Sequence, residues 1–167
     1  MLAGKAYMER HNQVAGIVYR NICTKYGLEG PGGRHPQKCW RTSRPRSCGT
    51  SRSHMVVTDQ PDIVVVDKHR KTVVVIDVAI PSDNNIRKKE HEKLEKYQGL
   101  KEEIERMWVM KATVVPVVIG TLVAVTPKLS RWLQQIPGTT SEISIQKSAV
   151  RGTAKILRRS LRLPGLW

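Results

Sequence analysis

Two runs of β-branched residues near the middle of the chain constrain the fold most strongly. Residues 63–66 read Ile-Val-Val-Val and residues 72–80 read Thr-Val-Val-Val-Ile-Asp-Val-Ala-Ile, with a polar stretch at 67–71 between them. β-branched residues favour strands, and two such runs joined by a short polar connector are typical of a β-hairpin. Because both runs are apolar on both faces, we expect a sheet that is covered on each side.

Further periodic segments lie on either side of this hairpin. Apolar residues recur at helical spacing over residues 5–27 and over residues 83–110, which predicts two helices. Residues 113–119 predict a third strand, in which Pro116 favours an edge position or a bulge. A chain ordered in this way is expected to form an α/β sandwich with a mixed sheet and a central hairpin flanked by helices.

Two shorter signals predict helices in the last third of the chain. Thr126 is expected to cap a short helix that runs to about Gln135. Thr139 and Glu142 have the spacing of a capping box and are expected to open a last helix. On one side of that helix lie the apolar residues Ile143, Val150, Ala154, Leu157 and Leu161.

Two aspartates in the hairpin are the first candidates for chemistry. Asp62 begins the first strand and Asp77 lies inside the second, where an unpaired carboxylate is costly. The expected pairing across the 67–71 turn places these two residues opposite each other. Neighbouring carboxylates repel unless a cation lies between them, and oxygen ligands suit Mg²⁺ or Mn²⁺.

A lysine on the predicted 83–110 helix completes the candidate site. Lys93 lies on the apolar face of that helix, with Glu90 one turn before it as a further ligand or a salt-bridge partner. An ammonium group there can orient water or stabilise the charge of a phosphoryl transition state. The structural alternatives are that Asp62 caps a turn, that Asp77 pairs with a buried lysine, and that Lys93 extends its ammonium group to solvent.

The charge of the chain is positive and concentrated outside its middle. Lys and Arg number 29 against 14 Asp and Glu, a formal net charge of +15, and residues 151–167 hold five bases and no acid. Such an excess favours polyanions, although an anionic membrane surface and plain solvated surface are alternatives. The residues we expect to contact DNA are Lys88, Lys89, Arg151, Lys155, Arg158, Arg159 and Arg162.

Composition also divides the chain into four parts. Residues 30–54 hold six Arg and Lys, three prolines and no acid, which predicts a disordered segment, with an arginine-rich nucleic-acid arm as the alternative. We therefore expect an N-terminal helix in 1–29, this basic segment, an α/β core in 55–138 and a basic helix in 139–167. The chain has no hydrophobic signal region and no apolar run long enough for a membrane span, so we expect a nuclear or cytoplasmic protein that is not secreted.

Four separated blocks resemble a known nuclease family. They are Pro61-Asp62 with 63–66, residues 74–80 around Asp77, residues 92–97 (Glu-Lys-Leu-Glu-Lys-Tyr) and residues 115–120 (Val-Pro-Val-Val-Ile-Gly). In this order they resemble the PD-(D/E)xK superfamily. Within it they are most similar to the restriction-enzyme-like endonuclease at the C-terminal end of non-LTR retrotransposon polyproteins, here as a truncated copy.

The resemblance implies a PD-(D/E)xK nuclease-like core and a metal-dependent DNA endonuclease that nicks its target by hydrolysing a phosphodiester. Asp62 and Asp77 match the metal-binding acids. Ala79 stands where the usual lysine would be, and Lys93, or Lys96 as the alternate, matches the helix lysine of this branch. Implied partners are Mg²⁺ or Mn²⁺ and DNA, with RNA as an alternative, and neither a membrane nor a small-molecule substrate.

The resemblance leaves two alternatives to an active nuclease. A reverse transcriptase would be supplied by a parent polyprotein, since none is recognised in this sequence, and residues 30–54 replace a strand that relatives carry. The chain is therefore either an endonuclease, a catalytically inactive remnant that only binds nucleic acid, or a non-functional fragment.

Overall fold

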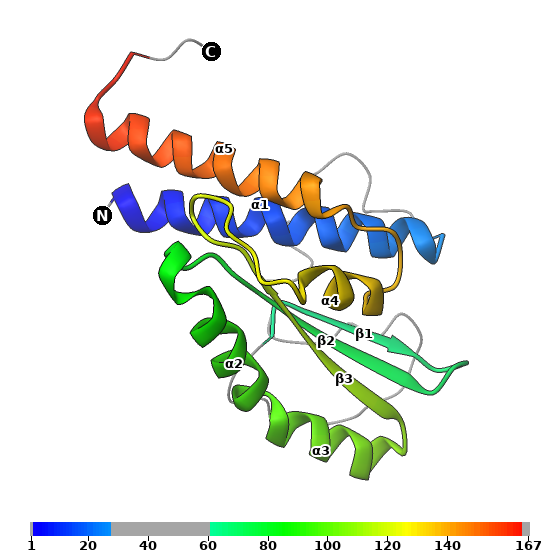
Figure 1. The fold of residues 1–167 in the computed structure, drawn as a ribbon. Helices are drawn as coiled ribbons and strands as arrows, with labels where there is room; N and C mark the ends of the chain where they lie inside the picture. Colours follow the sequence, from blue (N-terminus) through cyan, green and yellow to red (C-terminus); the bar gives the residue numbers. More distant parts are fainter. Residues whose placement is uncertain (1, 28–60, 165–167) are drawn as a thin grey trace.

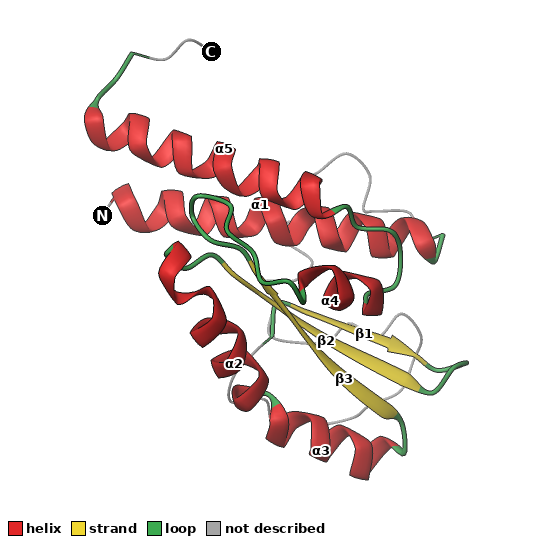
Figure 2. Cartoon of the chain, in the orientation of Figure 1, coloured by secondary structure: helices red, strands yellow, loops and turns green. Residues whose placement is uncertain are grey.

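The protein is described by a computed structural model that covers residues 2–27 and 61–164. A small sheet lies between two groups of helices (Figures 1 and 2). The elements, in chain order, are α1 (Leu2–Lys25), β1 (Ile63–Asp67), β2 (Thr72–Ala79), the 3₁₀ turn η2 (Asp83–Asn85), α2 (Ile86–Lys96), α3 (Gln98–Trp108), β3 (Lys111–Val118), α4 (Leu129–Gln135) and α5 (Glu142–Leu161). The predicted α/β class with a mixed sheet is confirmed. The predicted basic segment 30–54 lies outside the described residues.

The sheet has the strand order β1-β2-β3 within the described ranges. β1 and β2 form the predicted antiparallel hairpin, with Ile63 opposite Ile76, and β3 runs parallel to β2. Pro116 lies on β3, an outer strand of this sheet, as its missing N–H group requires. The α2–α3 segment supplies the connection that two parallel strands need.

The two faces of the sheet bury separate cores, as the apolar runs predict. Side chains of β2 alternate, so that Ile76 packs with residues of α1, α4 and α5, while Val75 packs with Tyr97 and Ile104 of the α2–α3 segment. β2 is buried along almost all of its length. This central strand therefore carries Asp77 deep into the molecule, with a side-chain exposure of 6%.

The single helix predicted over 83–110 is wrong in one respect. The segment opens with η2 and is divided into α2 and α3 at Tyr97, whose backbone leaves the helical region (φ −98°, ψ 6°). Tyr97 is almost fully buried, at 1% exposure, in the core below the sheet. Tyr97 packs there with Val73 and Val75 of β2, and α2 and α3 run in different directions on either side of this residue (Figure 1).

The predicted starts of the last two helices are also wrong. α4 begins at Leu129, and the Thr126 hydroxyl donates to Glu90 Oε2 at 2.6 Å instead of capping that helix. α5 begins at Glu142 after Ser141, and no side chain caps it. Glu142 accepts a hydrogen bond from the Ser130 hydroxyl at 2.8 Å, so a tertiary contact replaces the capping box.

α5 packs against α1 through small residues. The two helices lie side by side and antiparallel (Figure 1), and the buried residues of α5 are Ile145, Ala149, Gly152 and Ile156. A side chain at Gly152 would overlap Arg10 Cγ at 2.4 Å, so the close approach of α1 requires glycine there. α1 and α5, predicted as flanking segments, thus both contribute to the core above the sheet. No helix within the described ranges combines the length and the apolar composition that crossing a bilayer needs.

Candidate functional site

The hairpin brings the two predicted aspartates together. The ladder ends with Ile63 opposite Ile76, so Asp62, directly before β1, lies next to Asp77 on β2, and each carboxyl group shifts the pKa of the other. Both side chains are mostly buried, with exposures of 18% for Asp62 and 6% for Asp77. The predicted register is therefore confirmed.

Lys93 reaches the same place from α2. Its ammonium group forms an ion pair with Asp77 Oδ2, and its side chain is 18% exposed. Asp77 lies on the face of β2 that the α2–α3 segment covers, which is why a lysine in the last turn of α2 can reach it. The predicted grouping of Asp62, Asp77 and Lys93 is thus present in the structure.

A fourth residue of this cluster was absent from the sequence prediction. His11 on α1 places Nε2 3.1 Å from Asp62 Oδ2 and 3.1 Å from the Val78 carbonyl, while Nδ1 lies 3.3 Å from Asn12 Oδ1. All three neighbours are acceptors, so both ring nitrogens are placed to donate. His11 precedes the buried residues Val14, Ala15 and Val18 by three, four and seven positions, and this spacing is the signal that could have placed it on the inner face of α1.

The two aspartates of the cluster have pKa values shifted in opposite directions. Burial alone would raise the pKa of Asp62, but the hydrogen bond and charge of His11 outweigh burial and hold that pKa below its usual value. The Val78 amide also donates to Asp62 Oδ2 at 2.7 Å. Burial and the neighbouring Asp62 raise the pKa of Asp77, although Lys93 acts in the opposite direction. Burial lowers the pKa of His11, but Asp62 reverses this and the net shift is upward.

The chemistry of this donor set suits a hard divalent cation. Two carboxylates held side by side are the ligands that Mg²⁺ takes from proteins, which usually leave its other positions to water and substrate phosphates. The raised pKa of Asp77 reflects burial first and the neighbouring Asp62 second, and a bound cation would favour the ionised carboxylate. Asp62 and Asp77 therefore fit such an ion as a pair. Across residues 2–27 and 61–164, no group of three or more His, Cys, Asp and Glu side chains is arranged to hold a metal.

The remaining predicted site residues lie apart from this cluster. Glu90 is buried on α2 and accepts the Thr126 hydroxyl hydrogen bond, so it fastens α2 to the loop after β3. Lys96 is exposed, and its ammonium group lies 5.1 Å from the centre of the Tyr97 ring. Glu90 thus makes a tertiary contact to Thr126, and Lys96 makes a local contact at the end of α2.

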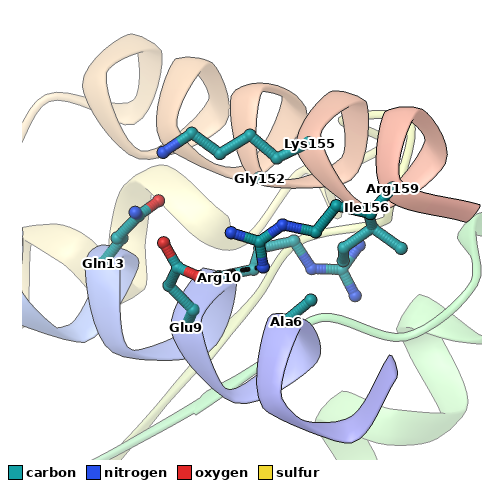
Figure 3. Close-up of a pocket in the computed structure, with 8 residues that line it drawn as sticks. All are labelled: Ala6, Glu9, Arg10, Gln13, Gly152, Lys155, Ile156 and Arg159. Atoms are coloured by element: carbon teal, nitrogen blue, oxygen red, sulfur yellow. Dashed lines mark hydrogen bonds and ion pairs between the residues drawn. The ribbon is translucent and has the colours of Figure 1, made fainter. Parts of the chain in front are cut away.

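The residues predicted to contact DNA lie on two helices. Lys88 and Lys89 are on α2, where Lys89 pairs with Glu92 at 3.0 Å. Arg151, Lys155, Arg159 and Arg162 are exposed on α5 or at its end, and Arg158 is half-buried. Figure 3 shows the shallow hollow that α5 forms with α1, where Arg10, Lys155 and Arg159 gather beside Glu9 and Gln13. Arg159 pairs with Glu9 at 3.4 Å, so this surface keeps a positive balance with one acid in it.

Comparisons with known proteins leave the family open. No protein-family model matches the chain, and no curated protein matches it. Among solved structures, an N-terminal domain of a reptarenavirus L protein is similar, with a TM-score of 0.43 and 15% sequence identity. The match covers 99% of this chain and 72% of that one. At this level of similarity it bears on neither activity nor site residues.

Proposed function

We propose that this chain is a metal-dependent DNA endonuclease domain of the PD-(D/E)xK type, derived from a non-LTR retrotransposon, which nicks its target by hydrolysing a phosphodiester. The observation that carries the proposal is the meeting of the Asp62 and Asp77 carboxyl groups with the Lys93 ammonium group. Two acids on a hairpin and a lysine on the next helix are also the residues that match the family motif. The positive charge of α5 supports a polyanionic substrate.

Each residue of the cluster has a distinct task in this proposal. Asp62 and Asp77 would hold Mg²⁺ or Mn²⁺, which when bound polarises the phosphoryl group and lowers the pKa of its water. Lys93, which pairs with Asp77 in this structure, would stabilise the negative charge that develops on the phosphoryl oxygens. His11 holds the Asp62 carboxylate in place and is a positioning residue.

A plasmid-nicking assay tests this proposal. With Mg²⁺, the wild-type chain is expected to convert supercoiled plasmid into the nicked form, and Asp77→Ala is expected to lower the rate by at least about 100-fold. Asp67→Asn is the matched control, because Asp67 lies at the opposite end of β1, and it is expected to nick like the wild type. Equal nicking by the wild type and Asp77→Ala would assign the activity to a contaminant and refute the proposed site.

A second candidate function is nucleic-acid binding without cleavage. It is favoured by the ion pairs of the cluster, in which both carboxylates already have a protein partner: Lys93 pairs with Asp77 and His11 with Asp62. This function predicts DNA binding that weakens steeply with salt and survives Asp62→Ala, with no metal-dependent nicking by any variant. Binding that depends on Mg²⁺ and on Asp62 would exclude it in favour of the nuclease.

A further inference from the structure

The outer surface of α5 carries an apolar stripe that no described part of the chain covers. Its members are Ile143 at 61% exposure, Val150 at 41%, Leu157 at 52% and Leu161 at 65%, together with the exposed Ala154. These are the apolar residues predicted on one side of the helix, but the structure buries the opposite side, with Ile145, Ala149, Gly152 and Ile156 against α1. α5 therefore has one apolar face inside the fold and a second one outside it.

The spacing of the outer stripe is that of a coiled-coil seam. Its positions alternate by four and three residues: 143, 147, 150, 154, 157 and 161. This pattern repeats every seven residues and presents a narrow ridge suited to a facing helix. At 1.5 Å per residue the ridge is about 27 Å long. Membrane binding grows with the apolar area that a helix buries, and this stripe is interrupted by Lys147 and the small Ala154, so the geometry favours a partner helix over a lipid surface.

The charges beside the seam determine which helix fits. Lys147 lies in the seam, Arg151 and Arg158 lie along one edge, and the other edge carries the neutral residues Gln146, Thr153 and Ser160. A parallel pair of two copies would bring Lys147 against Lys147. An antiparallel pair would bring the arginine edges together, and like charges in these positions oppose pairing.

We propose that the outer face of α5 is a docking site for an acidic amphipathic helix of another protein. The apolar residues of the partner helix pack against the seam formed by Ile143, Val150, Ala154, Leu157 and Leu161. Its acidic residues face Lys147 and Arg151. The inference does not rest on the proposed nuclease function, because its residues lie on α5, whereas Asp77 and Lys93 lie on β2 and α2.

A designed peptide tests the docking site on the full chain. The probe is a peptide of about three heptads with Leu at its seam positions and Glu at the edge positions, and the comparison peptide carries Lys in place of Glu. Fluorescence anisotropy is expected to show saturable binding of the Glu peptide and none of the Lys peptide. The double substitution Val150→Glu with Leu157→Glu is expected to weaken binding by about 30-fold or more.

Two further variants keep the test specific. Lys147→Glu with Arg151→Glu is expected to reverse the preference, so that the Lys peptide binds. Met107→Glu, at an exposed apolar residue of α3, is the matched control and is expected to bind the Glu peptide like the wild type. Equal binding of both peptides, binding of neither, self-association through the seam, or seam-dependent binding to phosphatidylserine vesicles alone would each overturn the proposal.

Discussion

Asp77 is the residue of the candidate site whose charge bears most directly on the stability of the fold. Its carboxyl group is almost completely buried beside Asp62, and its raised pKa means that the ionised form is disfavoured in the folded protein. A buried charge of this kind is tolerated when it serves binding or chemistry. Removing the charge should therefore relieve the fold while it disables the site.

We expect Asp77→Asn to separate these two effects in a thermal melt. In EDTA the variant should melt at the same temperature as the wild type or higher, by about 2–4 °C for each kcal/mol of repulsion removed. Addition of Mg²⁺ should raise the melting temperature of the wild type, because a ligand that binds only the folded state stabilises it, and should leave Asp77→Asn unchanged. A variant that melts well below the wild type in EDTA would contradict this account of Asp77.

Asp67 provides a pH-dependent contact at the other end of the hairpin. Its carboxylate accepts the Arg70 amide at 3.0 Å and the Tyr26 hydroxyl at 3.2 Å, and the Arg70 hydrogen bond is the main cause that lowers the pKa of Asp67. A lowered folded-state pKa contributes stability above the unfolded value, and this contribution is lost as the pH falls through the folded value. The unfolding free energy of the wild type should therefore exceed that of Asp67→Asn at neutral pH, and urea melts at decreasing pH should converge below about pH 4. A difference that stays constant down to pH 2 would show that charge is not its cause.

At the scale of elements, the site was more predictable than the helices around it. Asp62 and Asp77 could be paired from the sequence because a short turn fixes the register of a hairpin. Lys93 could be placed beside them because helical periodicity fixes the face of the helix on which it lies. His11 could not be assigned, since its contact with Asp62 spans 51 residues and depends on how α1 packs. Likewise, two of the four buried residues of α5 are Ala149 and Gly152, whose small size gives the inner face a weaker hydrophobic signal than the larger residues give the outer stripe.

Substitution of the glycine between α1 and α5 tests how closely these two helices pack. Gly152→Ala should destabilise the protein by about 1–3 kcal/mol, because the new methyl group would overlap the Arg10 side chain. Gly16→Ala is the matched control: it lies inside α1 with nothing within 4 Å of the added carbon, and it should stabilise by about 0.5–1 kcal/mol. Both values follow from urea melts. In a double-mutant cycle, Arg10→Ala should cost less in the Gly152→Ala background than alone, and strict additivity would argue against the overlap.

At the scale of the whole molecule, the first and last helices belong to the same folding unit as the sheet. Ile145 and Ala149 of α5 are fully buried in the core that also contains Val14 and Val18 of α1 and Ile76 of β2. The basic C-terminal helix is thus a structural part of the α/β core as well as a carrier of charge. Loss of its inner face should remove support from α1, and with it the His11 contact to Asp62.

Substitutions at two isoleucines, two positions apart on α5, test whether the fold and the site depend on the inner face of this helix. Ile145 is 0% exposed and Ile143 is 61% exposed, so the same substitution at each reports the face of α5 that the fold uses. Ile145→Asp should cost about 4 kcal/mol or more, through a lost side chain and a buried charge, which approaches the total stability of a typical domain. Its far-ultraviolet circular dichroism melt should lose cooperativity, and any Mg²⁺-dependent nicking should disappear although Asp62, Asp77 and Lys93 are all present. Ile143→Asp should melt like the wild type. If instead Ile143→Asp unfolds the protein and Ile145→Asp does not, α5 packs through its outer stripe, and both the folding unit and the docking site inferred for that stripe are wrong.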